Sequence, residues 1–254
     1  MHNKKRLSTI ISVVLLSLIA VAFIFPFVWM VATSLKPTTE VFSLSPTGSR
    51  IAWDNYPSAL NSIPFGRVVL NSFIVSLAGA ALVVVVSVLS AYAFARLRFK
   101  GRDHLFMLFL GTLVLPQEVL VIPLYIGMQR MGLVNSYFAL IVPFAFGAFG
   151  AFLIRQFLMS LPLEFEEAAR IDGCSDWKIL TKILLPLLKA PITVVGVFAF
   201  IDYWSAFLWP LIVVNDSSLA TIPLGLQMFS GERGTDWGPL MAAVTMTTIP
   251  SILL

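Results

Sequence analysis

Long stretches of this sequence contain no side chain that is charged at neutral pH. They cover residues 7–35, 68–95 and 131–154. Each stretch exceeds the roughly 20 residues that a helix needs to cross a bilayer. Over the whole chain, 58% of the residues are hydrophobic and 12% are charged, which is outside the range of soluble domains. We therefore predict an all-α integral membrane protein.

Three further apolar windows follow the same pattern. Two contain a single acid each, Glu118 and Asp202, and the window 237–254 contains no charge. At about 1.5 Å per residue the last window spans roughly 27 Å, barely the hydrocarbon thickness, so we expect a few more residues after Leu254. The predicted single transmembrane domain, 1–254, has six helices, at about 8–33, 68–95, 105–127, 136–156, 190–213 and 237–254.

Lys and Arg residues predict the orientation, because basic loops tend to stay on the cytoplasmic side. With the N-terminus inside, the inner segments hold twelve of these residues and the outer segments hold five. Both termini are therefore predicted to be cytoplasmic, with outer loops at 34–66 and 214–236 and an inner loop at 157–188. The same rule explains the net charge of +4 without nucleic acid as a partner.

The sequence offers little for catalysis or metal binding. Cys174 is the single cysteine, and His2 and His104 have no cysteine nearby in metal-ligand spacing. No G-x-x-x-x-G-K-[ST] phosphate loop is present, so any ATP must be bound by another chain. We expect a chain that is not an enzyme and has no cofactor or metal of its own.

The inner loop 157–188 reads as helix, turn, helix. Glu164, Glu166 and Glu167 fall in the first turns, where the helix dipole favours acids. Gly173 suits a left-handed C-terminal cap, Ser175 suits an N-cap, and Pro186 ends or kinks the second helix.

The first of these helices, about a dozen residues, is too short to be stable alone in water. A partner surface could hold it, with Glu167 as a charge and with apolar anchors at Phe165, Ile171 and Trp177. The alternative is an amphipathic helix that rests on lipid headgroups, although three acids make an anionic surface less favourable.

The loop carries a fixed pattern: Glu167-Ala168-Ala169, three residues, Gly173, nine residues, Ile183, any residue, Leu185-Pro186. This pattern resembles the signature of the inner-membrane permease subunits of binding-protein-dependent ABC importers. The chain is most similar to the smaller, maltose-permease-like subunit of the carbohydrate-uptake branch. The residues that carry this narrower resemblance are Trp53-Asp54-Asn55-Tyr56, Asn71-Ser72, Ala91-Tyr92-Ala93, Pro123-Leu124-Tyr125, Ile171-Asp172-Gly173, Phe207-Leu208-Trp209-Pro210-Leu211 and Thr221-Ile222-Pro223-Leu224-Gly225.

The resemblance implies a permease subunit that moves a sugar or polyol by alternating access. It implies four partners: a second homologous permease, a dimer of ATPase subunits that hold ATP and Mg, an extracytoplasmic solute-binding protein, and a bacterial or archaeal cytoplasmic membrane. It does not specify the sugar. The residues expected to couple to the ATPase are Glu167, Ala168, Ala169, Asp172, Gly173, Ile183, Leu185 and Pro186.

Two acids lie within predicted membrane helices. A carboxylate at mid-membrane costs about 2.5–3.5 kcal/mol on insertion scales, so Asp202 must face protein or water. It either lines a sugar cavity with Tyr203, Trp204 and Ser205 or pairs with a polar group of the partner permease. Glu118, which follows Pro116 in a helix predicted to be kinked, either serves the freed backbone through water or lines the same cavity.

Thr221, Pro223 and Gly225 fall in the second outer loop. By resemblance this loop contacts the binding protein, and the alternative is a solvent-exposed connector. An ion-coupled secondary transporter or channel would need an intramembrane relay, for which only Glu118 and Asp202 are available. A membrane-embedded enzyme would need clustered acids or histidines. Neither class explains the 167–186 pattern.

Overall fold

The computed structural model of the chain describes residues 2–231 and 234–253. Leu254, the predicted end of the last helix, lies outside them, as do residues 232–233 of the predicted outer loop. The regular secondary structure of the described part is helical apart from one short antiparallel hairpin, β1 (Ser230–Gly231) with β2 (Gly234–Thr235).

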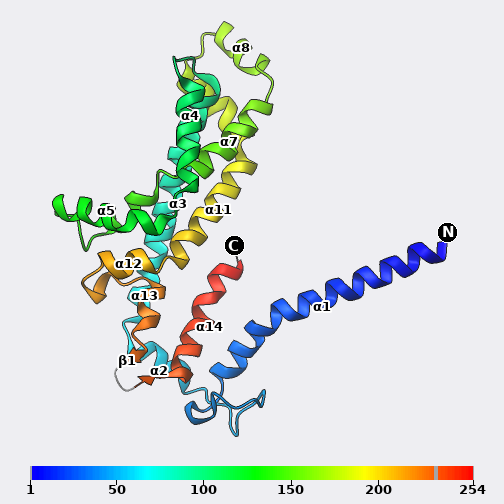
Figure 1. Cartoon of the computed structure of the whole chain (residues 1–254), viewed down its shortest axis with the longest axis vertical. Coiled ribbons are helices and arrows are strands. Elements are labelled where there is room, and N and C mark those ends of the chain that lie inside the picture. The colour runs from blue at the N-terminus through cyan, green and yellow to red at the C-terminus, as the bar shows by residue number, and fades with distance from the viewer. Residues whose placement is uncertain (1, 232–233, 254) are drawn as a thin grey trace. The chain divides into compact units, whose positions relative to one another are not determined.

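The helices follow one another along the whole chain (Figure 1). They are α1 (His2–Ser34), α2 (Asn55–Ser62), α3 (Phe65–Arg96), α4 (Arg102–Gly111), α5 (Gln117–Arg130), α6 (Tyr137–Ile141), α7 (Ala148–Ser160), α8 (Glu164–Ile171), α9 (Asp176–Ile179), α10 (Leu185–Leu187), α11 (Lys189–Ser205), α12 (Leu208–Val213), α13 (Ile222–Gln227) and α14 (Trp237–Leu253). A π-helix at Leu180–Leu184 joins α9 to α10. Single 3-10 turns lie at Thr38–Glu40, Thr112–Val114, Val142–Phe144 and Ser217–Leu219.

The chain divides into two compact units, where the sequence predicts one transmembrane domain. The first unit contains residues 1–66 and 225–254, and in it α14 packs against both α1 and α2. Its small core includes Ala59, Phe229 and Ala242. The second unit contains residues 67–224 and carries the candidate site.

Two described helices are long and apolar enough to cross a membrane without a break, Thr9–Ser34 and Phe65–Arg96. Three further pairs of helices are bent at a short break, and each pair could cross the membrane if it is taken as one span. They are Arg102–Val114 with Gln117–Arg130, Tyr137–Phe144 with Ala148–Ser160, and Asp176–Leu187 with Lys189–Ser205. The described part of α14 has 17 residues, at the lower limit of what spans a bilayer. The count of six helices and the orientation of the termini therefore stay predictions.

The predicted helix 105–127 differs most from the structure. It is broken before α5, and its two parts meet at 102°. A residue before proline is disfavoured in the helical region, and Leu115, which precedes Pro116, is extended at ψ 121°. The predicted helix 190–213 is also interrupted, because Ala206 is extended between α11 and α12.

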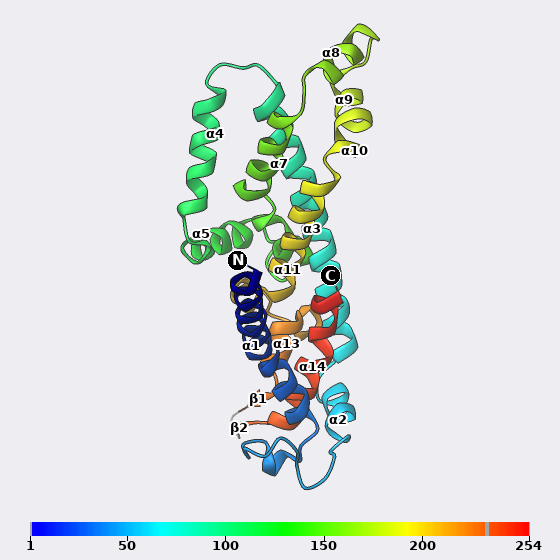
Figure 2. The ribbon, with the colours of Figure 1, turned by 90° about the vertical axis from the view of Figure 1, so that its right-hand side faces the viewer.

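The second unit has two apolar clusters in its interior. One joins α3, α7, α8, α9 and α11 and includes Ala91, Ile154 and Leu184. The other joins α3, α5, α6, α11 and α12 and includes Val75, Leu140 and Val213. Within this unit, α8 lies at one end (Figure 2) and α12 lies toward the other (Figure 1). The helices α3 and α11 contribute to both clusters, and so they connect the two ends.

Candidate functional site

The α8 segment, defined here as residues 164–186, begins with a helix of eight residues, shorter than the dozen expected. Its C-terminus is closed by a Schellman motif. The Gly173 N–H donates to the Arg170 carbonyl (3.0 Å), and the Cys174 N–H donates to the Ala169 carbonyl (2.9 Å). Gly173 has φ +77°, the left-handed conformation that glycine adopts without steric cost.

A buried ion pair holds α8 against α3. The Arg96 Nε, at the end of α3, donates to the Glu166 carboxylate, and the two side chains are 7% and 5% exposed. The same guanidinium donates through Nη2 to the carbonyls of Leu158 (2.8 Å), in the last turn of α7, and Leu161 (3.2 Å), just after it. Arg96 therefore connects three elements. Sequence analysis missed this pair, because the two residues are 70 positions apart and no local pattern relates them.

The predicted coupling residues divide between the surface and the interior. Ala169 is buried in the apolar cluster beneath α8, and Ile183 is half-buried against that cluster. The exposed members are Glu167, Ala168, Asp172, Gly173, Leu185 and Pro186. Three large apolar side chains beside them are exposed as well: Phe165 (53%), Ile171 (87%) and Trp177 (65%). The α8 segment therefore presents exposed charged side chains together with uncovered large apolar ones.

The second half of the α8 segment follows its local sequence signals. The Ser175 hydroxyl accepts from the Lys178 N–H at the start of α9, and Arg170 pairs with Asp176 (2.7 Å) across the turn. Pro186 lies in α10, and the chain then bends by 81° into α11. The α8 segment is therefore directly continuous with α11, which starts two residues after α10 ends.

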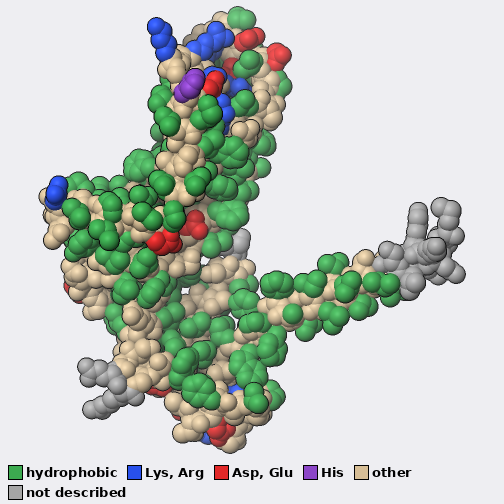
Figure 3. Space-filling view, viewed as in Figure 1, with side chains coloured by type: hydrophobic (Ala, Val, Ile, Leu, Met, Phe, Trp, Pro, Cys, Tyr) green, Lys and Arg blue, Asp and Glu red, His purple; other side chains and the backbone are tan. Residues whose placement is uncertain are grey.

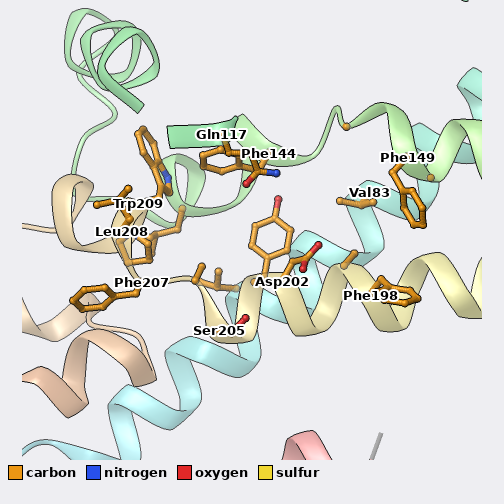
Figure 4. Close-up of a pocket in the computed structure, with 18 of the residues that line it drawn as sticks. Val83, Gln117, Phe144, Phe149, Phe198, Asp202, Ser205, Phe207, Leu208 and Trp209 are labelled. Atoms are coloured by element: carbon orange, nitrogen blue, oxygen red, sulfur yellow. The ribbon is translucent and has the colours of Figure 1, made fainter. Parts of the chain in front are cut away.

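A cavity of about 430 Å³ lies at the opposite end of α11. Its walls come from α3, α5, α6, α7, α11 and α12 and are largely apolar, with Phe144, Phe149, Phe198 and Trp209 among them. The charged side chains of the lining are Glu118 and Asp202. Figure 4 shows Asp202 pointing from α11 toward Gln117 and Phe144, whereas Ser205 points to the other side of the helix.

Four of the five predicted pathway residues line this cavity: Glu118, Asp202, Tyr203 and Ser205. The Tyr203 hydroxyl donates to the Ile141 carbonyl (2.5 Å), and the Ser205 hydroxyl donates to the Ile201 carbonyl (2.7 Å). Neither Glu118 nor Asp202 has a hydrogen bond or ion pair with a described residue. Glu118 therefore lines the cavity and makes no direct hydrogen bond to the described backbone.

Trp204 differs from the prediction. It is 6% exposed and packs edge-on against Phe73, with ring centroids 4.9 Å apart, and stacks on Phe200 at 5.5 Å. Its ring lies within the packing of α11 against α3 and does not line the cavity.

The predicted binding-protein contacts also point inward. Thr221 is 1% exposed, Gly225 is buried and Pro223 is half-buried. The loop before them is tied to α3, because the Asn71 amide donates to the carbonyls of Ser218 and Ala220, both at 2.9 Å. The exposed residues of this loop are Asn215, Asp216 and Ser217.

No group of three or more potential metal ligands is found among the described His, Cys, Asp and Glu residues. Cys174, in the turn after α8, is a free thiol of intermediate exposure.

This arrangement of helices is the fold of an ABC transporter permease. It matches a chain in the crystal structure of a bacterial ABC transporter involved in the import of the acidic polysaccharide alginate, with a TM-score of 0.87 and 23% identity. The match covers 98% of this chain and 94% of that chain.

The protein belongs to the family of binding-protein-dependent transport system inner membrane components, whose model matches residues 83–254. It is 37% identical to the sn-glycerol-3-phosphate transport system permease protein UgpE of Pectobacterium atrosepticum, over 100% of this chain and 94% of that protein. It is 32% identical to the lactose transport system permease protein LacG of Rhizobium radiobacter, over 99% and 92%. It is 33% identical to the arabinooligosaccharides transport system permease protein AraQ of Halalkalibacterium halodurans, over 99% and 93%.

Proposed function

We propose that this chain is the permease subunit of an ATP-driven importer that carries a sugar or polyol across the inner membrane of a bacterium. Relatives from several bacteria are named as permeases for lactose, arabinooligosaccharides and sn-glycerol-3-phosphate. An extracytoplasmic binding protein delivers the substrate. A second homologous permease completes the pathway, and ATPase subunits bind ATP and Mg. An ion-coupled secondary transporter or channel would leave the α8 segment without a role.

The α8 segment is the observation that carries the proposal. Its eight-residue helix is closed by a Schellman motif and is held against α3 by the Arg96 ion pair. The helix can therefore bind another protein without a change of its own conformation. Its exposed face offers the Glu167 carboxylate between Phe165 and Ile171, which are apolar and uncovered. Exposed large apolar side chains with polar and charged groups beside them are typical of a protein-docking surface, and Glu167 offers a charge to a basic residue of the partner. We assign that groove to the cytoplasmic ATPase.

The α8 segment is connected to the cavity through α11. The α8 segment packs on α3 and α11 through one apolar cluster, and α11 ends in the cavity wall. The 17 residues of α11 span about 26 Å, and a packed helix transmits a tilt over its full length. Closure of the ATPase dimer would tilt α11 and change the cavity. This is how ATP hydrolysis would alternate access.

Site-directed cross-linking tests the docking of the ATPase. Cys174 is the only cysteine, so Cys174→Ser gives a background without thiols. In that background we would place a cysteine at exposed Ala168 and, as a control, at exposed Ser45 of the predicted outer loop. A cross-linker with one maleimide arm and one photoreactive arm is then added to the assembled importer in membranes opened to the reagent, so that the ATPase needs no thiol of its own.

The proposal predicts a cross-link between the ATPase and Ala168→Cys, and none with Ser45→Cys. If Ala168→Cys reacts with a small maleimide but never joins the ATPase in an intact complex, the assignment of the α8 segment is wrong.

A further inference from the structure

The polar groups of the cavity are mostly engaged with the protein itself. Tyr203 and Ser205 donate their hydroxyl protons to backbone carbonyls. Trp209 also lines the cavity, and its indole Nε1 donates to the Ala139 carbonyl (2.8 Å). A hydroxyl has one proton and an indole has one N–H. These three side chains therefore have no donor left for a ligand.

The free polar groups that remain are mainly acceptors. The carboxylates of Glu118 and Asp202 and the amide of Gln117 line the cavity without a hydrogen bond to any described residue. An ionised carboxylate accepts hydrogen bonds and cannot donate them. Gln117 is the one group among them that retains N–H donors.

The charge of the cavity has the same sign throughout. Its lining contains the two acids and no Lys, Arg or His within the part of the chain that the structure describes. In Figure 3, acidic side chains are exposed at mid-height in the second unit, within a surface that is otherwise largely hydrophobic. The described acids that form ion pairs, Asp54, Asp103, Glu166 and Asp176, all lie outside the cavity.

We infer that this cavity selects neutral, hydroxyl-rich substrates and rejects those that carry a phosphate or carboxylate. The inference rests on the proposed function and names the substrate class of its pathway. Sugar hydroxyls supply the donors that Glu118 and Asp202 lack, and hydrogen bonds to a charged acceptor are among the stronger ones. A phosphate or carboxylate brings acceptors only, and it also meets two charges of its own sign.

The apolar lining fits the rest of such a substrate. Phe144 meets Trp209 edge-on, with centroids 5.4 Å apart, and Phe149 meets Phe198 at 6.1 Å. Aromatic faces of this kind pack against the C–H faces of a sugar ring. The inference therefore separates this chain from the relative named for the anionic substrate sn-glycerol-3-phosphate, despite 37% identity.

The test measures ATP-driven uptake by the complete importer with its own binding protein in proteoliposomes. The neutral probes are lactose, arabinotriose and glycerol, and the anionic probes are lactobionate, trigalacturonate and sn-glycerol 3-phosphate. Mass spectrometry of the ligand released from the native binding protein adds that compound to the series. Each rate is divided by the fraction of the binding protein that the probe occupies, and the measured quantity is the ratio of the fastest neutral rate to the fastest anionic rate after this division.

We expect a ratio of about tenfold or more, the factor that corresponds to about 1.4 kcal/mol. In the double variant Glu118→Gln with Asp202→Asn the ratio falls toward one, while Asp103→Asn, outside the cavity, leaves it unchanged. A purely structural role for the two acids would lower both rates together and leave the ratio intact. Uptake of anionic probes as fast as neutral ones in the wild type would overturn the inference and leave the importer standing. Failure of any ATP-driven uptake would overturn both.

Discussion

Replacing Arg96 by methionine is predicted to release α8 from the body of the permease. The variant keeps a long apolar side chain but leaves the Glu166 carboxylate buried without its partner. Breaking a buried ion pair by removing one member costs about 3–5 kcal/mol. The carbonyls of Leu158 and Leu161 also lose the donor that each receives from Arg96.

At about 1.4 kcal/mol per factor of ten, this cost raises the opening equilibrium of α8 roughly 140-fold to 3,700-fold. Amide hydrogen exchange in the assembled importer measures that equilibrium directly. The informative amides are those of Asp172, Gly173 and Cys174, which bond to carbonyls of α8. ATP-driven uptake is expected to fall with the loss of protection, while membrane insertion is unchanged.

Two further variants make the test sharp. Arg50→Met breaks an exposed pair with Asp54 and should leave exchange at residues 172–174 unaltered. Arg96→Met with Glu166→Met removes both buried charges and should recover much of the protection, because no unpaired charge remains. Unchanged exchange at 172–174 in Arg96→Met would refute the role of the pair.

Three other predictions concern the site and its surroundings. Gly173→Val should strain the left-handed cap by about 1–2 kcal/mol and reduce uptake at equal expression. Gly173→Asn should retain uptake, because asparagine tolerates this conformation. Equal uptake by the two variants would contradict the role of the cap. Gly150→Ala would place a Cβ 2.2 Å from the Ser87 hydroxyl of α3 and should lower the melting temperature in detergent, because overpacking costs about 1–3 kcal/mol. Gly196→Ala should not, since its Cβ would lie 3.6 Å from its nearest neighbour, Val84. Equal melting temperatures of the two variants would be inconsistent with this packing. A backbone N–H bond lowers the pKa of Asp216 below its ordinary 3.8, so this carboxylate stabilises the outer loop above pH 3.8 and the stabilisation is lost as pH falls through the lowered pKa. Limited proteolysis of that loop should stay constant from pH 7 to 5, and cleavage that increases within this window would oppose the assignment.

The local signals of the α8 segment are readable from the sequence because they act over four residues or fewer. Gly173 takes its left-handed conformation and Ser175 caps α9, as predicted from residue type and spacing. The Arg96 to Glu166 pair was not predictable in this way, since it depends on how α3 and α8 pack. Which groups on α8 are exposed follows from that same packing.

The breaks in the helices could be predicted from the sequence only in part. Pro116 predicts a kink, but the angle of 102° depends on what α5 packs against. The position of Trp204 likewise depends on which side of α11 faces α3. Phe198 and Asp202, four residues apart, share a face of α11, whereas Ser205 points to the other side (Figure 4) and Trp204 packs against Phe73 of α3. Only the packed structure tells which face borders the cavity.

The central claim is that ATP hydrolysis by a bound partner drives a sugar through this permease. The most direct measurement is uptake into proteoliposomes that contain the purified importer and its binding protein, with the ion gradients collapsed by ionophores. The account predicts uptake that requires ATP on the ATPase side and continues without any gradient. Uptake that needs an ion gradient and proceeds without ATP would contradict it.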